Sequence, residues 1–191
     1  MAGRQAKTVT PHAIQRMLAY AARSSTPERD RVIVLLSVKA GLRAAEIAKL
    51  TWPMVLDARG RVSDRIELAD RAAKKGSGRR IPLHPDLRAA LRALWSVGEA
   101  QGPVVRSARG GAMAPNSIVN WFIAMCAALD LKGCSSHSGR RTFITRAARL
   151  AHRAGGSLRD VQMLAGHRSI ETTQRYIDGD TDAQRKLVAL I

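Results

Sequence analysis

Cysteine is scarce in this sequence, which limits the kinds of site that the chain can build. The two cysteines among 191 residues, Cys126 and Cys134, match neither a disulfide framework nor the ligand spacing of a zinc site. No glycine-rich P-loop is present, so any phosphate chemistry would be carried out by side chains. We predict no metal and no cofactor, and we expect Cys126, on the apolar stripe of a helix, to be a buried thiol.

Long apolar runs are also missing. No stretch approaches the roughly 20 residues that a helix needs to cross a bilayer. Residues 1–10 are polar and basic and lack the apolar core of a signal peptide. We therefore expect a cytoplasmic protein that has no membrane partner.

Acidic residues are few relative to basic ones. Asp and Glu number 15 against 32 Lys and Arg, which gives a formal net charge of +17. This excess favours a polyanionic partner, and the predominance of arginine suits bidentate recognition of phosphate. Two alternatives remain: a high-GC genome would explain part of the arginine excess, and an anionic membrane surface would attract the same charge. The membrane is the weaker alternative, because no basic segment carries the large apolar face that it requires.

Helical periodicity dominates the chain, whose hydrophobic fraction of 46% is enough for a core. A basic, glycine-containing stretch, 71–80, lies between short β-prone pieces and predicts a hairpin. The fold class is therefore α+β, mostly α-helical, with a small antiparallel sheet near residues 55–83. Helices are expected from Pro11, over 31–40, over 44–50, from Pro85, over 115–129, over 138–153, from Ser157 to Gly166, and from about Ser169 through Tyr176.

The C-terminal third holds residues that suit cleavage of a phosphodiester without metal. This chemistry needs a nucleophile, donors for the nonbridging oxygens and an acid for the leaving oxygen. The sequence reads His137-Ser-Gly-Arg140, then Gly166-His167, then Tyr176 nine residues after that histidine. This pattern resembles the tyrosine recombinases, the phage integrase family, whose late motif has His-x-x-Arg, Leu-Gly-His and a tyrosine at that spacing.

Two earlier segments extend the resemblance, which spans residues 10–178. Arg43 and Glu46 match the segment that supplies the first arginine of the family and an acidic partner. The family's β-hairpin lysine precedes a basic-apolar-Pro-Leu run, which here is 80–83. Counting back places Lys74 at the catalytic position, with Lys75 left open as the alternative. Taken singly, each residue has a structural interpretation, but five motifs in the family's order favour the functional one.

The resemblance implies a mechanism in which Tyr176 attacks the scissile phosphate and forms a 3′-phosphotyrosine, releasing a 5′-hydroxyl. Arg43 and Arg140 would clamp the phosphate, a task that suits the planar guanidinium. His167 would donate a further hydrogen bond to the same oxygens. The bond energy is kept in the phosphotyrosine, so neither ATP nor a metal is required.

Proton transfer and DNA contacts are assigned by the same resemblance. His137 would be the general base and Lys74 the general acid, while Glu46 would orient a neighbour, either Arg43 or His137. Double-stranded DNA is the expected partner. Further DNA contacts are expected from these basic residues: Arg71, Lys75, Arg79, Arg80 and Arg141.

The resemblance also sets expectations for organisation. We expect residues 1–191 to form a single catalytic domain, without the N-terminal DNA-binding domain that most family members carry. The tail 177–191 would pack on a neighbouring protomer or fold back on its own core, and strand exchange would require a tetramer on two duplexes. The protein would be bacterial or phage-derived and associated with the nucleoid. Gly139 stands where the family usually has leucine, so the start of its helix is expected to be looser yet tolerated.

Three functions follow, in order of preference. The first is a site-specific recombinase or integrase. The second is a type IB topoisomerase, which shares the chemistry but spaces its lysine and tyrosine differently. The third is a non-catalytic DNA-binding or regulatory module derived from a mobile element, against which the intact tyrosine and arginines argue.

Overall fold

Proline and capping residues set where the helices begin. The computed structural model describes residues 6–73, 76–97, 101–176, 185 and 188–189. Its elements, in chain order, are α1 (Pro11–Ala21), α2 (Pro27–Lys39), α3 (Ala44–Lys49), η1 (Trp52–Met54), β1 (Arg65–Leu68), β2 (Arg79–Pro82), α4 (Pro85–Val97), α5 (Pro115–Ala128), α6 (Ser138–Ala151), η3 (His152–Ala154), α7 (Leu158–Ala165) and α8 (Ile170–Gln174). The expected class, mostly helical with one small antiparallel sheet, is confirmed.

Two helix starts show the local chemistry that the sequence predicts. The Oγ1 of Thr10 accepts the N–H of Ala13 at 3.2 Å, so it satisfies a donor that α1 leaves open. The carboxylate of Asp160 accepts the N–H of Ser157 at 2.7 Å and completes a capping box on α7. Gly166 then ends α7 in the left-handed conformation, at φ +62°, which favours glycine.

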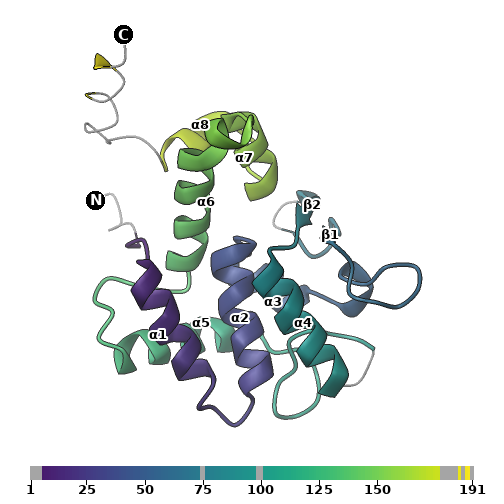
Figure 1. Cartoon of the computed structure of the whole chain (residues 1–191). Coiled ribbons are helices and arrows are strands. Elements are labelled where there is room, and N and C mark those ends of the chain that lie inside the picture. Colours follow the sequence, from purple (N-terminus) through teal and green to yellow (C-terminus); the bar gives the residue numbers. More distant parts are fainter. Residues whose placement is uncertain (1–5, 74–75, 98–100, 177–184, 186–187, 190–191) are drawn as a thin grey trace.

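The main core surrounds α2, which runs through the middle of the body (Figure 1). Its residues 32–36 are fully buried, and α2 packs against α1, α4 and α6. A second, smaller cluster lies where α6 meets α7, around Ile144, Val161 and Ala165. Because α6 contacts α2 as well as α7, it connects the C-terminal helices to the main body.

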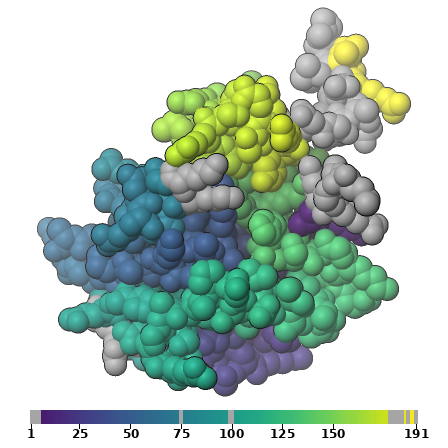
Figure 2. Space-filling view, turned by 180° about the vertical axis from the view of Figure 1, so that it is seen from behind, coloured from purple at the N-terminus to yellow at the C-terminus, as the bar shows by residue number. Residues whose placement is uncertain are grey.

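The sheet is a two-stranded antiparallel ladder at one side of the body. Ile66 faces Ile81 across the strands, and both side chains are buried. β2 also contacts α7, and Figure 2 shows the C-terminal helices, in yellow-green, lying above the blue segment that carries the sheet. The sheet therefore reaches the C-terminal helices as well as the main core.

Gly139, where the sequence analysis expected lost side-chain packing, is buried where α6 packs against α2. A Cβ at this position would lie 2.9 Å from the Cβ of Ser37 and 3.0 Å from the Cγ1 of Val38. Such distances are too short for real Cβ contacts, so the glycine allows the two helices to approach closely. Close backbone packing thus takes the place of the leucine side chain.

The end of the chain differs from the prediction in one respect. Helix α8 ends at Gln174, and Tyr176 lies in the turn that follows, where its N–H donates to the carbonyl of Thr173 at 3.0 Å. Lys74, Lys75 and most of the tail 177–191 lie outside the described residues. Within the described ranges, no helix is long and apolar enough to cross a membrane.

Candidate active site

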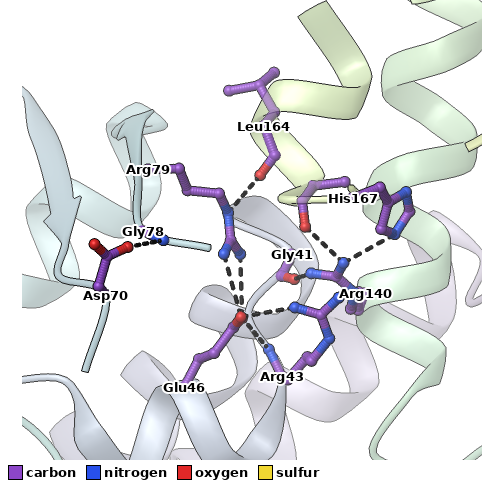
Figure 3. A network of polar contacts seen from close by, with 10 residues as sticks. Gly41, Arg43, Glu46, Asp70, Gly78, Arg79, Arg140, Leu164 and His167 are labelled. Atoms are coloured by element: carbon purple, nitrogen blue, oxygen red, sulfur yellow. Dashed lines mark hydrogen bonds and ion pairs between the residues drawn. The ribbon is translucent and has the colours of Figure 1, made fainter. Parts of the chain in front are cut away.

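Glu46 is the centre of a buried ionic network at the start of α3 (Figure 3). Its carboxylate accepts the backbone N–H of Arg43 at 3.0 Å and the guanidinium of Arg43 at 2.7 Å. The guanidinium of Arg79, from β2, donates to both carboxylate oxygens at 3.2 and 3.1 Å. Glu46 therefore holds two arginines from different elements, and it is only 1% exposed.

The charge of Glu46 is maintained by these arginines. Burial alone would raise the pKa of this carboxyl, because it disfavours the charged form. Hydrogen bonds and positive charge from Arg79 and Arg43 outweigh burial and lower the pKa to about 2. Glu46 is an anion throughout the physiological range, and it orients Arg43, one of the two neighbours expected from the sequence. No contact joins Glu46 to His137 among the described interactions.

Arg79 lies inside the protein, although the sequence analysis expected it to contact DNA. Its side chain is 6% exposed, and its Nε donates to the carbonyl of Leu164, near the end of α7, at 2.8 Å. The next residue along β2, Arg80, points the other way: its side chain is 77% exposed, 3.7 Å from Glu67. Alternation along the strand explains the difference, because successive side chains face opposite sides of a sheet.

Arg140 is the second buried arginine and lies in the first turn of α6. It is 3% exposed, and its Nη1 donates to the carbonyl of Gly41 at 2.6 Å while its Nη2 donates to that of Ala165 at 2.7 Å. Burial and the nearby charge of Arg43 lower its pKa to about 10, so it stays a cation at neutral pH. Together, Arg79 and Arg140 satisfy two carbonyls at the C-terminal end of α7, where positive charge is favoured.

His167 lies between Arg140 and α8. Its Nε2 is 3.1 Å from the Nη2 of Arg140, and its Nδ1 is 3.0 Å from the Oγ1 of Thr173. Arginine has no acceptor, so in the neutral ring Nε2 accepts and the proton is assigned to Nδ1. Burial and the charge of Arg140, followed by Arg43 and Arg79, lower the pKa of His167 to about 4.

Tyr176 stacks on His167, with ring centroids 5.5 Å apart and an angle of 23° between the planes. The guanidinium carbon of Arg141 lies 5.8 Å from the centre of the tyrosine ring. Beside these rings is a cavity of about 690 Å³, which Arg43 and Arg140 also line. The cavity therefore brings together the tyrosine and three of the groups expected to bind phosphate.

The remaining predicted residues are placed less centrally. His137 is exposed and lines the same cavity, and its ring contacts Ser136. Its backbone N–H donates to the Oγ of Ser135, and its carbonyl accepts the N–H of Arg141. Lys74 and Lys75 fall outside the described residues, while Arg71 is exposed in the turn before them. Within the described ranges, no group of three or more His, Cys, Asp or Glu could hold a metal ion.

Sequence reasoning missed two contributors to this cavity. Thr173 holds the ring of His167 and is completely buried, and Arg175 lines the cavity beside Tyr176. Both residues lie in the segment between His167 and Tyr176, and this position could have indicated that they are near the site, since a short helix brings its ends close together. No comparable pattern in the sequence indicated that the side chain of Arg79 would be buried.

Comparison with known proteins shows the family to which the chain belongs. The sequence model of the phage integrase family matches residues 7–182. The chain belongs to the phage integrase family. It is 32% identical to the tyrosine recombinase XerC of Rhodospirillum centenum over 162 residues, which cover 81% of this chain and 43% of that protein. It is also 32% identical to XerC of Myxococcus xanthus over 164 residues, covering 78% and 49%. The chain thus spans about half the length of the curated relatives it matches.

Solved structures share the fold of this integrase-family chain. The XerA recombinase superposes with a TM-score of 0.73 at 21% identity, covering 96% of this chain and 64% of that one. A lambda integrase tetramer bound to a Holliday junction gives a TM-score of 0.66 at 21% identity, covering 89% and 47%. At this identity the likeness establishes the fold, and the chemistry rests on the site.

Proposed function

We propose that this chain breaks and rejoins DNA through a covalent 3′-phosphotyrosine on Tyr176, as a site-specific recombinase or integrase. The observation that carries the proposal is the shared cavity, which Arg43 and Arg140 line together with the stacked rings of Tyr176 and His167. Membership of the phage integrase family supports it. The substrate class is double-stranded DNA, which the net charge of +17 favours.

The phosphate is bound first. Arg43 is held by Glu46 and Arg140 by two backbone carbonyls, so both guanidiniums are fixed before the substrate arrives. Fixed donors need no reorganisation when negative charge develops on the nonbridging oxygens. The bound phosphate also offsets the positive charge that lowers the pKa of His167, so it favours the protonated ring. The protonated imidazole then donates to the phosphate.

The tyrosine oxygen then attacks phosphorus, and the bond from phosphorus to the 5′-oxygen breaks. The phenolic proton passes to a base, for which His137 is the proposed group since it lines the same cavity. The leaving 5′-oxygen takes a proton from the hairpin lysine, proposed as Lys74. Attack of a 5′-hydroxyl on the phosphotyrosine reverses these steps and rejoins the strand.

Assembly and organisation form part of the same proposal. One relative is a lambda integrase tetramer on a Holliday junction. We propose that four copies of this catalytic domain act on two duplexes, with the tail 177–191 between protomers. Site specificity comes from contacts of this domain in the DNA grooves or from partners.

The test is capture of the covalent intermediate. Nicked suicide duplexes carrying the flanks of the protein's own gene are incubated with the chain in EDTA, and the product is examined on a denaturing gel. A protein–DNA adduct is expected with the wild type and is absent in Tyr176→Phe. Tyr20→Phe is the matched control, because the only other tyrosine lies away from the cavity, against Trp121.

Each outcome distinguishes a function. No adduct on any duplex would overturn the proposal and leave a DNA-binding module. An adduct accompanied by relaxation of plasmids of arbitrary sequence would indicate a topoisomerase instead of a recombinase.

A further inference from the structure

A second hollow shares His167 with the cavity that Tyr176 lines. It is a cavity of about 430 Å³ between the hairpin at the start of β2 and helix α7. Four arginines line it, Arg79, Arg80, Arg159 and Arg168, and we call it the basic groove. Of these, Arg79 is paired with Glu46. His167 lines both the basic groove and the cavity that holds Tyr176.

The charged side chains that line the basic groove are mostly arginines. Among the described residues, no acidic side chain lines it. Glu67 reaches the rim, 3.7 Å from Arg80, in a pair whose side chains are both largely exposed and therefore weak. Asp70 approaches Gly78, but its Oδ1 is occupied by the backbone N–H of that glycine at 2.8 Å (Figure 3). An anionic ligand would therefore meet a positive surface.

A buried glutamine connects the basic groove to the active site. Gln162 is 4% exposed, and its Oε1 accepts a hydrogen bond from Arg159 at 2.8 Å. Its Nε2 donates to the backbone carbonyl of His167 at 3.0 Å. Arg159 and His167 are thus held at a fixed separation by one rigid amide, and Arg168 follows His167 directly in the chain.

We propose that the basic groove binds a second phosphate of the cleaved DNA strand, next to the phosphate that Tyr176 attacks. The inference rests on the proposed function and extends it. A DNA strand carries a phosphate about every 3.4 Å along the helix axis, and His167 lines both hollows, so neighbouring phosphates of one strand can occupy them. Contacts with Arg159 and Arg168 fix the register of the strand, that is, its position along the groove. Because Gln162 contacts both Arg159 and His167, this position is set relative to the active site.

The test is the salt dependence of DNA binding. The double variant Arg159→Gln/Arg168→Gln and the wild type are titrated onto a short fluorescent duplex over a series of KCl concentrations. The control is Arg23→Gln/Arg92→Gln, which removes the same charge from exposed residues that line neither cavity. Circular dichroism establishes that each variant is folded.

We expect the slope of log affinity against log salt to fall by about 1 for each phosphate that the groove variant no longer binds. The slope of the control should change much less. Arg159→Lys/Arg168→Lys should restore most of the slope, because the charge is kept. Equal slopes in the groove and control variants would overturn the inference.

The outcome is separable from that of the proposed function. If wild type forms the Tyr176 adduct but the groove variant keeps the control's slope, the second phosphate site fails and the cleavage proposal stands. If the slope falls in the groove variant but no adduct forms on any duplex, the cleavage proposal fails and the groove remains a DNA-binding surface without the proposed register.

Discussion

The contrast between two adjacent arginines gives the sharpest test of the network at Glu46. Arg79 and Arg80 occupy neighbouring positions in β2, yet one side chain is 6% exposed and the other 77%. Arg79→Met removes the bidentate partner of a buried carboxylate, whereas Arg80→Met removes a weak surface pair. The two variants have the same change in composition and charge.

The expected magnitudes differ severalfold. Removing one partner of a buried ion pair costs about 3–5 kcal/mol, because the other charge is left uncompensated. Glu46 keeps Arg43, so we expect about 3 kcal/mol for Arg79→Met. Arg80→Met should change stability by about 0.5 kcal/mol or less.

Urea denaturation followed by circular dichroism measures both effects, provided that the slope m is unchanged. The double variant Arg79→Met/Glu46→Gln adds a second check. With neither charge buried, its loss of stability should be smaller than the sum of the two single losses by more than about 1 kcal/mol. Equal losses in Arg79→Met and Arg80→Met, or additive losses in the double variant, would refute the reasoning.

Two further predictions concern packing and pH. Gly139→Ala should lower the free energy of unfolding by about 1–3 kcal/mol, since its Cβ would meet Ser37. The control, Gly111→Ala, meets nothing within 4 Å and should lower it far less. Thermal unfolding compares the two variants, and equal melting temperatures would contradict the close approach of α6 and α2. His167 has a pKa lowered from 6.5 to about 4, so the unfolded state binds its proton first and stability should fall as pH drops from about 6.5 toward 4. In His167→Gln this fall, measured by urea midpoints between pH 7 and 5, should be smaller; an unchanged pH profile would exclude a buried neutral histidine.

Local features of this molecule follow from the sequence because they depend on neighbours in the chain. Thr10 and Ser157 cap helices through atoms within three residues, and Gly166 ends α7 by its own backbone freedom. The order of Arg43, Arg140, His167 and Tyr176 could be matched to the phage integrase family for a related reason. The reaction requires these residue types, and proteins of one fold present them in the same order along the chain.

The tertiary structure decided what each arginine does. Arg79 and Glu46 are 33 positions apart, and Arg140 and His167 are 27 apart, so no local pattern predicts their hydrogen bonds. The direction of Arg79 depends on which face of a two-stranded sheet packs against α3 and α7. The need for a small residue at Gly139 likewise arises only because Ser37 of α2 lies against it. Sequence determined which groups are available and in what order, while packing determined which charges are buried, because burial depends on segments brought together from distant parts of the chain.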